Sequence, residues 1–345
     1  MAEDESSKPD HPSERRPQEV ILSMAFGYLP SRAIFVAAEL GIADLLRRGA
    51  KSIEELAVAT GTYTDSLYRL LRMLASHGIF AEDEQGRFHV TPLAAALESG
   101  VPGSVRDAVR MVDGPTWNSC GNLLHAVKSG TPAFDAAFGM GFFDYLAMHP
   151  EASARFDASM ANFSEGENSI IAAAYDFNRF KQIVDVGGGR GGFIAEVLKA
   201  HPSPTGILYD RPEVVVEPTY PRAAGVIERC KVIGGNFWES VPRGGDAYIL
   251  KRILHDWRDD QAIAILRLCR DAMSDHGRVL TIDAVIPPGN EAHPSKDSDI
   301  FMMAMVPGRE RSETEFRALY QNAGLKLTNI VPTRSALCIV EGKRE

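Results

Sequence analysis

Cysteines are few in this sequence and show no pairing pattern. None of the four forms a C-x-x-C pair or lies near a histidine at the spacing of a metal site. We therefore expect buried, reduced thiols, with no metal site and no disulfide framework. The four are Cys120, Cys230, Cys269 and Cys338.

The chain also lacks an excess of basic residues and an obvious membrane segment. Its 37 Lys and Arg stand against 46 Asp and Glu, and the net charge of −9 argues against non-specific nucleic-acid binding. We identify no apolar stretch long and uninterrupted enough to span a bilayer, and residues 1–19 contain no apolar signal core. We interpret residues 1–19 as a disordered tail and expect a cytoplasmic protein without a membrane or nucleic-acid partner.

The most informative stretch is KQIVDVGGGRGGF, residues 181–193. Its β-branched run is typical of a buried parallel strand, five glycines follow, and helical apolar spacing begins at Phe193. Strand, glycine turn and helix together predict a nucleotide-type site, because glycine lets the backbone approach a ligand closely. Gly187, Gly189 and Gly192 also satisfy the dinucleotide fingerprint G-x-G-x-x-G.

Asp210 completes this unit. It ends a second predicted strand, GILYD, 23 residues after Gly187, where doubly wound folds hold a ribose. A dinucleotide site and an S-adenosylmethionine site share this pattern, so it leaves both open.

The region before the glycines divides in two. A capping box at Ser52 and Glu55, a second helix and a hairpin over residues 79–91 predict a winged-helix module. Its second helix carries few basic residues, which favours packing or dimerisation over DNA reading. From Asp113 the chain is predicted to be helical and rich in aromatics, and Met160 and Phe163 are candidates for a pocket around a flat ligand.

From Ile183 onward strands and helices alternate, as in a doubly wound, mostly parallel sheet. The last two predicted strands, LKLTNIVPT and SALCIVEG, form an antiparallel hairpin. The expected fold class is therefore α/β, a Rossmann-like sheet with a terminal antiparallel hairpin, preceded by a mainly α winged-helix-like domain.

Residues that follow two further strands are suited to ligand chemistry. Asn236 can hydrogen-bond an adenine edge and Phe237 can stack on the ring. His255 follows the strand DAYILK on the ligand side, where its pKa suits a general base. Asp283, at the end of the fifth strand, and Glu310, before a capped helix, are carboxylates able to orient the imidazole.

At this point the motifs resemble a known family. VDVGGGRGG, YDRPEVV, GGNFWESVPRGGDAYILKRILHDWRDDQ and GRERSETEFRALYQNAGL, in this order, are similar to blocks of S-adenosylmethionine-dependent O-methyltransferases. The resemblance is to the caffeic acid, hydroxyindole and bacterial antibiotic-tailoring type, and it runs from about Val20 to Gly342. It implies methylation of a hydroxyl on a small aromatic acceptor, phenolic or polyketide-like, by a homodimer without a metal.

The resemblance also implies roles and boundaries. Gly187 and Gly189 would face the methionine part of the cofactor, Asp210 the ribose, and Asn236, Phe237 and Lys251 the adenine end. His255 would be the general base, flanked by Asp283 and Glu310. Met302 and Met303 are further pocket candidates. The implied organisation is a tail at 1–19, a winged-helix-like dimerisation domain at 20–110, a helical linker and substrate-pocket region at 111–178 and a cofactor-binding methyltransferase domain at 179–345.

Three features depart from the family pattern, and in one of them the aromatic pair often seen around 117–120 is reduced to Trp117 with Ser119 and Cys120. The family usually has Asp where this chain has Asn236, and often Glu where it has Asp283, whose side chain is one methylene shorter. The alternatives are a relative that has changed to hydroxylation or decarboxylation, an NAD-dependent oxidoreductase, and a DNA-binding regulator.

Overall fold

The computed structural model describes residues 16–345. The chain divides into two units, one ending at Val112 and the other spanning Asp113–Glu345. Most of the tail predicted at 1–19 lies outside the described residues, and the first helix already begins at Pro17.

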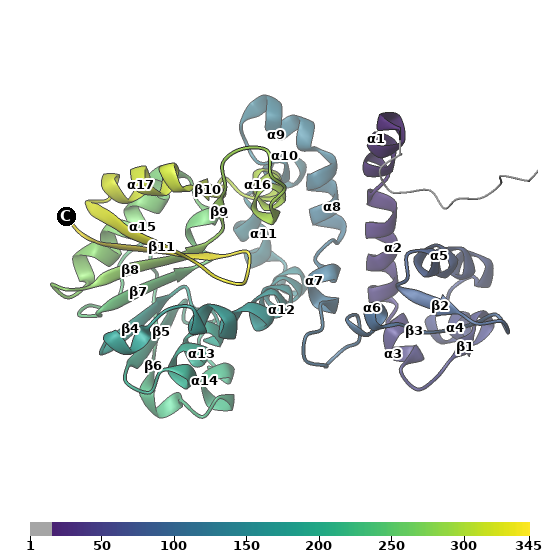
Figure 1. The fold of residues 1–345 in the computed structure, drawn as a ribbon, viewed down its shortest axis with the longest axis horizontal. Helices are drawn as coiled ribbons and strands as arrows, with labels where there is room; N and C mark the ends of the chain where they lie inside the picture. Colours follow the sequence, from purple (N-terminus) through teal and green to yellow (C-terminus); the bar gives the residue numbers. More distant parts are fainter. Residues whose placement is uncertain (1–15) are drawn as a thin grey trace, which may run out of the picture. The chain divides into compact units, whose positions relative to one another are not determined.

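The first unit is a small helical domain with a three-stranded sheet in the order β1-β3-β2 (Figure 1). The predicted capping box forms, since Ser52 Oγ accepts the N–H of Glu55 and the Glu55 carboxylate accepts the N–H of Ser52. The second helix buries Leu67, Leu71 and Leu74, and the predicted hairpin pairs β2 with β3. The winged-helix-like arrangement is therefore confirmed. The elements are α1 (Pro17–Ala25), α2 (Tyr28–Glu39), α3 (Ile42–Leu46), β1 (Lys51–Ser52), α4 (Ile53–Thr60), α5 (Thr64–Ser76), β2 (Phe80–Glu82), β3 (Arg87–Val90), α6 (Pro92–Ala95) and α7 (Arg106–Arg110).

Helices α1 and α2 expose apolar side chains within this unit. Together they form a stretch, Pro17–Glu39, that is long and apolar enough to cross a membrane by length and composition alone. The expectation that no such stretch exists was therefore wrong. Core helices of soluble proteins and signal sequences share these properties, so the finding by itself does not define a membrane segment. The exposed apolar residues are Val20, Ile21, Leu22, Met24, Phe26, Tyr28 and Leu29.

The second unit opens with helices rich in aromatic residues. Phe134 is fully buried at the centre of a ring cluster with Phe138, Phe142 and Tyr145, and helix α16 packs its Met305 against this cluster. The helices are α8 (Gly114–Gly121), α9 (Leu123–Ser129), α10 (Ala133–Phe138), α11 (Phe142–Met148) and α12 (Pro150–Ala173).

A seven-stranded sheet forms the rest of this unit, in the order β11-β12-β8-β7-β4-β5-β6. The predicted terminal hairpin is present, because β11 and β12 are antiparallel to each other and β12 is antiparallel to β8. The sequence RVLTIDAVI, residues 278–286, predicts one strand, but the structure divides it: β8 ends at Asp283, and β9 pairs with β10 in a separate two-stranded sheet. The strands are β4 (Gln182–Val186), β5 (Thr205–Asp210), β6 (Cys230–Gly234), β7 (Ala247–Lys251), β8 (Arg278–Asp283), β9 (Val285–Ile286), β10 (Arg311–Ser312), β11 (Leu325–Pro332) and β12 (Cys338–Arg344).

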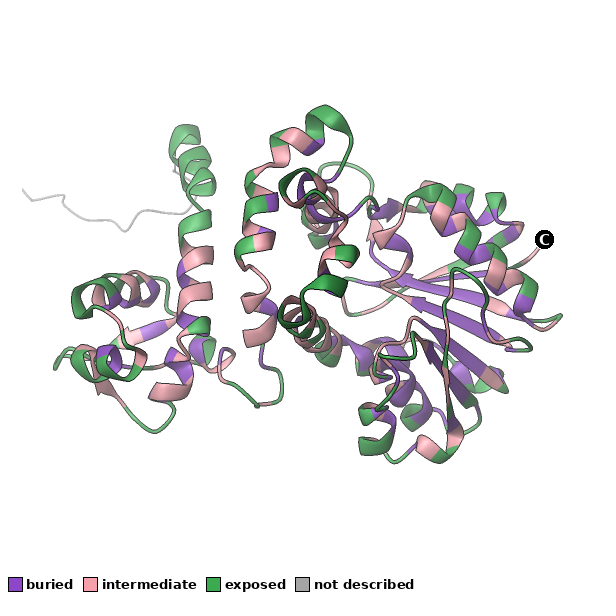
Figure 2. Cartoon of the chain, turned by 180° about the vertical axis from the view of Figure 1, so that it is seen from behind, coloured by how far each residue is buried: buried purple, intermediate pink, exposed green. Residues whose placement is uncertain are grey.

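Helices cover both faces of the sheet, whose inner strands are mostly buried, whereas the edge strands β6 and β11 are partly exposed (Figures 1 and 2). Alternate residues of each strand enter opposite cores: Ile183 packs into one core and Val184 into the other. The helices are α13 (Gly192–Ala200), α14 (Thr219–Ala223), α15 (Asp259–Ala272), α16 (Pro294–Met305) and α17 (Glu313–Asn322), with short 3-10 turns η2 (Phe177–Arg179), η3 (Ile227–Arg229) and η4 (Leu254–Asp256).

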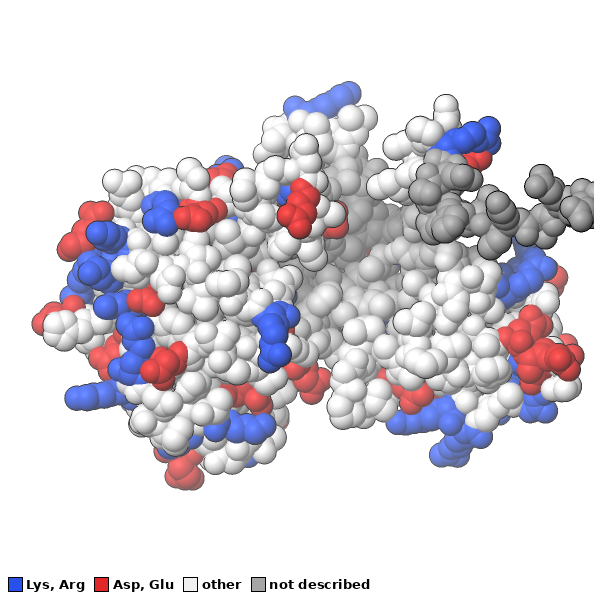
Figure 3. Space-filling view, viewed as in Figure 1, with Lys and Arg blue, Asp and Glu red and all other residues white. Residues whose placement is uncertain are grey.

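The strand order places the site. The chain moves from β4 outward to β5 and β6 and then returns to β7 on the other side of β4, which makes a topological switch point between β4 and β7. In open α/β sheets ligands bind beyond the carboxyl ends of the strands at such a point. On the face seen in Figure 3, basic and acidic side chains are interspersed on both units.

Candidate active site

The glycine turn after β4 requires glycine. Gly187, Gly189 and Gly191 have φ angles of +70°, +58° and +86°, a region that other residues rarely adopt. The N–H of Gly187 donates to the carbonyl of Tyr209 at 2.8 Å, which ties the turn to the end of β5. No heavy atom lies within 4 Å of the position that a Cβ would take on Gly189, so the backbone is open to a ligand there.

Asp210 organises this turn from the end of β5. Its Oδ2 accepts the N–H of Gly189 at 2.8 Å, and its Oδ1 accepts the N–H of Arg211 at 2.7 Å. Burial raises the pKa of the Asp210 carboxyl, and the two hydrogen bonds, which lower it, only partly offset that effect. Each oxygen keeps acceptor capacity, as a ribose diol requires.

Phe237 lies beside the glycine turn, whereas Asn236 is engaged locally. A Cβ on Gly187 would lie 3.7 Å from Cε1 of Phe237 and 2.5 Å from Cδ1 of Ile253, so these side chains border the turn. The Asn236 carbonyl accepts the N–H of Trp238 at 3.0 Å and its amide donates to Glu239 at 3.1 Å. Asn236 thus shapes the loop after β6, and its adenine contact stays a prediction.

Lys251 ends β7 and has partners on α12. Its ammonium donates to Glu167 at 3.0 Å and to Ser164 at 3.1 Å. Burial lowers the pKa of this lysine, and the Glu167 carboxylate opposes that effect. The expected contact of Lys251 with adenine therefore has no support in its observed partners and stays a prediction.

His255 lies in η4, directly after β7, and is buried. Its Nδ1 is 3.2 Å from Oε1 of Glu310, which also accepts the hydroxyl of Ser298 at 2.7 Å. The backbone around it is fixed by the buried guanidinium of Arg311, which donates to the carbonyls of Leu254 and Trp257. The structure thus brings His255 and Glu310, predicted from distant parts of the sequence, into direct contact.

Several carboxylates surround this imidazole. Burial lowers the pKa of His255, but the charges of Asp256, Asp283 and Glu310 outweigh that effect and raise it to about 9. Oδ1 of Asp256 is 3.6 Å from Nε2, on the side of the ring opposite Glu310. Glu310 itself has a lowered pKa, because the hydrogen bond and ion pair with His255 outweigh the effect of its burial.

Asp283 is close enough to influence His255 electrostatically but has no hydrogen bond to it. Both of its carboxylate oxygens are buried without a partner among the described residues. Burial raises the pKa of this carboxyl to about 7. Of the two carboxylates predicted to flank the imidazole, only Glu310 hydrogen-bonds it.

The aromatic cluster of α10 and α11 extends to the segment of His255. Phe143 stacks on Trp257 with ring centroids 5.5 Å apart, and Trp257 meets Trp238 edge-on at 4.6 Å. Among the predicted pocket residues, Met302 packs against this cluster and Phe163 is exposed. Met160 and Met303 are half-buried, and their place in a pocket stays a prediction.

Three residues at the site were missed by the sequence reasoning. Asp256 lies beside the imidazole and Trp257 joins the aromatic cluster, and their position directly after His255 was the available signal. Glu167 lies in the middle of a long helix, and no motif distinguishes it from a surface glutamate.

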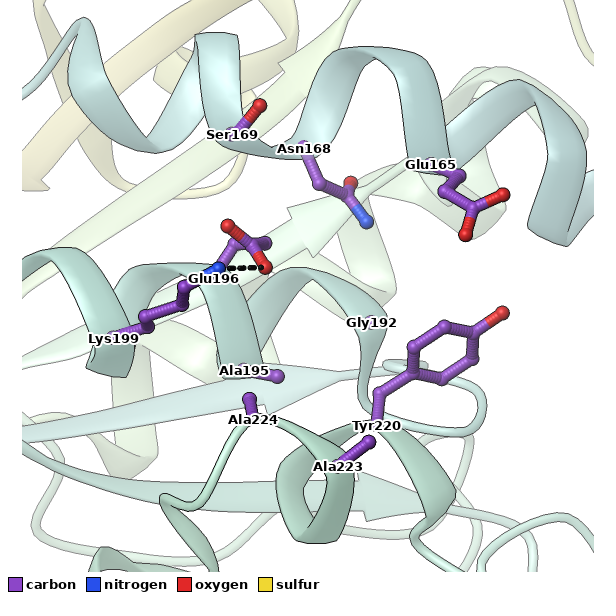
Figure 4. Close-up of a pocket in the computed structure, with 10 residues that line it drawn as sticks. All are labelled: Glu165, Asn168, Ser169, Gly192, Ala195, Glu196, Lys199, Tyr220, Ala223 and Ala224. Carbon is purple, nitrogen blue, oxygen red and sulfur yellow. Dashed lines mark hydrogen bonds and ion pairs between the residues drawn. The ribbon is translucent and has the colours of Figure 1, made fainter. Parts of the chain in front are cut away.

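A groove of about 430 Å³ lies elsewhere, between α12, α13 and α14 (Figure 4). Asn168 and Glu165 of α12 and Tyr220 of α14 point toward it, and Gly192 lies at its side. It contains neither His255 nor Asp210 and does not coincide with the site described above.

The residues at the carboxyl ends of β4, β5 and β6 suit S-adenosylmethionine. The open backbone at Gly189, the acceptor oxygens of Asp210 and the ring of Phe237 offer a cradle, a ribose ligand and a stacking surface. A carboxylate below the turn, Asp185, is buried with Oδ2 unpartnered, and burial raises its pKa to about 7. Fold and site define the class of Rossmann-like methyltransferases.

Comparisons with known proteins identify the family. Residues 120–326 match an O-methyltransferase domain, and residues 22–99 match an O-methyltransferase dimerisation domain. The chain is 41% identical over 325 residues to a phenazine O-methyltransferase, PhzM, of Lysobacter antibioticus, covering 94% of this chain and 95% of that protein. The crystal structure of LaPhzM superposes with a TM-score of 0.92 at 40% identity, covering 96% of this chain and all of the other. The O-methyltransferase NcsB1, solved with S-adenosylmethionine and a hydroxylated naphthoic acid, has a TM-score of 0.81 at 33% identity, covering 92% and 96%.

The chain therefore belongs to the O-methyltransferase family and is an S-adenosylmethionine-dependent O-methyltransferase. Membership in the O-methyltransferase family overturns two alternatives, an NAD-dependent oxidoreductase and a non-enzymatic DNA-binding regulator.

Proposed function

We propose that this enzyme methylates a hydroxyl on a small aromatic acceptor, with His255 as the general base. The observation that carries this proposal is the contact of His255 Nδ1 with Glu310, at 3.2 Å, beyond the carboxyl end of β7. Phe143 and Trp238 contact Trp257, two residues after His255, and such aromatic side chains suit a flat acceptor. The relatives named above act on such compounds.

The hydrogen bond to Glu310 selects the nitrogen that accepts the proton. With Nδ1–H donating to Glu310, the lone pair of a neutral ring lies on Nε2. Nε2 then removes the hydroxyl proton, and the carboxylates of Glu310 and Asp256 stabilise the imidazolium that forms. A positioned base of this kind contributes about 10²–10⁴-fold to the rate.

The remaining residues hold the reactants. When bound, S-adenosylmethionine supplies a methyl group on a positively charged sulfur, which is a strong electrophile. Asp210 and the backbone of Gly187 and Gly189 would hold it beyond β4 and β5. Phe237 would cover the adenine. Holding two reactants in position lowers the barrier by about 7–11 kcal/mol.

A homodimer is part of the proposal. Residues 22–99 match a dimerisation domain, and α1 and α2 expose a continuous set of apolar residues that a second copy would cover. We place the dimer in the cytoplasm, as expected for an enzyme of small-molecule biosynthesis.

Replacement of His255 by Ala tests the proposal. We expect turnover to fall by at least about 100-fold while the dissociation constant for S-adenosylmethionine, measured by calorimetry, changes little. Unchanged turnover would remove His255 from its role. A product that carries an added oxygen or has lost carbon dioxide, in place of an added methyl group, would favour the alternative of a changed reaction.

A further inference from the structure

Glu167 joins α12 to the end of β7 through three charged contacts. Its Oε1 accepts from Lys251 Nζ at 3.0 Å and from Arg252 Nε at 3.1 Å, and its Oε2 accepts from Arg252 Nη2 at 3.1 Å. The arginine contact is bidentate, the geometry that fixes orientation most firmly. Glu167 is buried, so these contacts are shielded from water.

Arg252 has an unusual backbone. Its φ of +54° is the only positive value for a residue other than glycine in the described part of the chain. Such a conformation is strained in a residue with a Cβ and persists only where surrounding contacts enforce it. Its N–H donates to the carbonyl of Ile282 on β8 at 3.0 Å, and its side chain is held by Glu167.

This turn directs the chain into η4, which carries His255 three residues later. The far end of that segment is fixed by Arg311 through the carbonyls of Leu254 and Trp257. The near end is fixed by Arg252, whose charge also lowers the pKa of Asp256 and Glu310, although burial and the contacts with His255 have larger effects on both.

We infer that Glu167 is a positioning residue for methyl transfer, which acts through its bidentate ion pair with Arg252 to hold the segment that carries His255. This inference rests on the proposed role of His255. It assigns to α12 a part in placing the base, although no residue of α12 contacts the imidazole among the described interactions.

Glu167→Gln tests the inference, because glutamine keeps the shape and loses the charge and one acceptor. We expect kcat to fall about 10- to 100-fold, since a displacement of about 1 Å at a reacting group has effects of this size. The acceptor KM and the dissociation constant for S-adenosylmethionine should change less than about threefold. Glu165→Gln, an exposed acid of the same helix that lines the separate groove, is the matched control and should leave kcat unchanged.

Arg252→Gly provides a second route if Glu167→Gln fails to fold. Glycine adopts the backbone conformation of residue 252 without strain, so this variant removes the guanidinium and also removes the backbone strain at the turn. We expect a similar loss of kcat, and the double variant should lose no more than the more affected single variant. Fully additive losses, or a kcat for Glu167→Gln within twofold of the parent enzyme, would overturn the inference.

The acceptor dependence separates this inference from the proposed function. With ring-substituted phenols accepted by the parent enzyme, the deficit of Glu167→Gln should shrink as the phenol pKa falls below the assay pH, as for His255→Ala. A shrinking deficit for His255→Ala with a constant one for Glu167→Gln would refute the positioning role alone. No deficit in His255→Ala would refute the proposed function itself.

Discussion

The charge around His255 predicts an alkaline activity profile. Burial alone would lower the pKa of this imidazole, but the neighbouring carboxylates raise it to about 9. Only the neutral ring accepts a proton, so kcat/KM should rise with pH and level off above about pH 9. A profile measured from pH 6 to 10.5 with an acceptor whose hydroxyl does not titrate in that range checks this. A plateau already reached at pH 7 would contradict the electrostatic account.

Asp283 should contribute to the pH dependence of kcat/KM, because its charge raises the pKa of His255. It influences His255 as a charge and not as a hydrogen-bond partner, so Asp283→Asn should remove one of the charges that raise the imidazole pKa. We expect the inflection of kcat/KM to move to lower pH. Asp275→Asn, at a highly exposed carboxylate, is the control and should leave the inflection in place. A shift toward higher pH would disprove this role for Asp283.

Sequence reasoning predicted the positions of Asp210 and His255 in the fold, whereas their roles stay proposals. Asp210 and His255 were placed because the end of a parallel strand fixes which edge of the sheet a side chain reaches. Glu167 could not be found this way, since its role depends on which face of a 24-residue helix meets Lys251 and Arg252. The partner of Lys251 was missed for the same reason.

At the scale of elements, the missing side chain of Gly308 lets the segment that carries Glu310 pack directly against the backbone of the segment that carries His255. A Cβ at Gly308 would overlap the carbonyl oxygen of His255 and the backbone of Asp256 and Trp257, which have little room to shift. We expect Gly308→Ala to destabilise the fold by about 1–3 kcal/mol and to lower kcat at least about tenfold.

Gly166→Ala is the matched control for this prediction. Gly166 lies inside α12, and no heavy atom lies within 4 Å of the position that its Cβ would take, so alanine should stabilise the helix by about 0.5–1 kcal/mol. Denaturant unfolding and turnover at the same temperature measure both variants. A fully stable, fully active Gly308→Ala enzyme would show that the two segments do not depend on this close packing.

The elements themselves were predicted well where periodicity is strong. The capping box at Ser52 and the terminal hairpin both formed as expected. The division of residues 278–286 into β8 and β9 was not predicted, because apolar composition continues through Ala284 while the pairing partner changes from β7 and β12 to β10.

For the whole molecule, the exposed apolar residues of α1 and α2 carry the dimer proposal. Leu22→Glu places a charge among side chains that a second copy would bury. We expect the dimer to dissociate at micromolar concentration in light scattering. Val216→Glu, at another exposed apolar position, in the second unit, is the control and should leave the mass unchanged. A Leu22→Glu protein with the mass of the parent dimer would exclude this surface.

The order of motifs along the sequence predicted the architecture of the whole chain. The seven-stranded sheet and the winged-helix-like unit follow from patterns that each segment carries by itself. The identity of the acceptor cannot be predicted in this way, because the aromatic cluster that we propose receives it combines α10, α11 and the segment after β7, and their contacts depend on tertiary packing.

The most direct test of proton removal by His255 is the dependence of kcat on the phenol pKa in His255→Ala. If the imidazole removes the proton, the variant should approach the parent rate with acceptors already ionised at the assay pH and fall at least about 100-fold behind with weakly acidic ones. An equal deficit across the whole series, or none at all, would contradict the account.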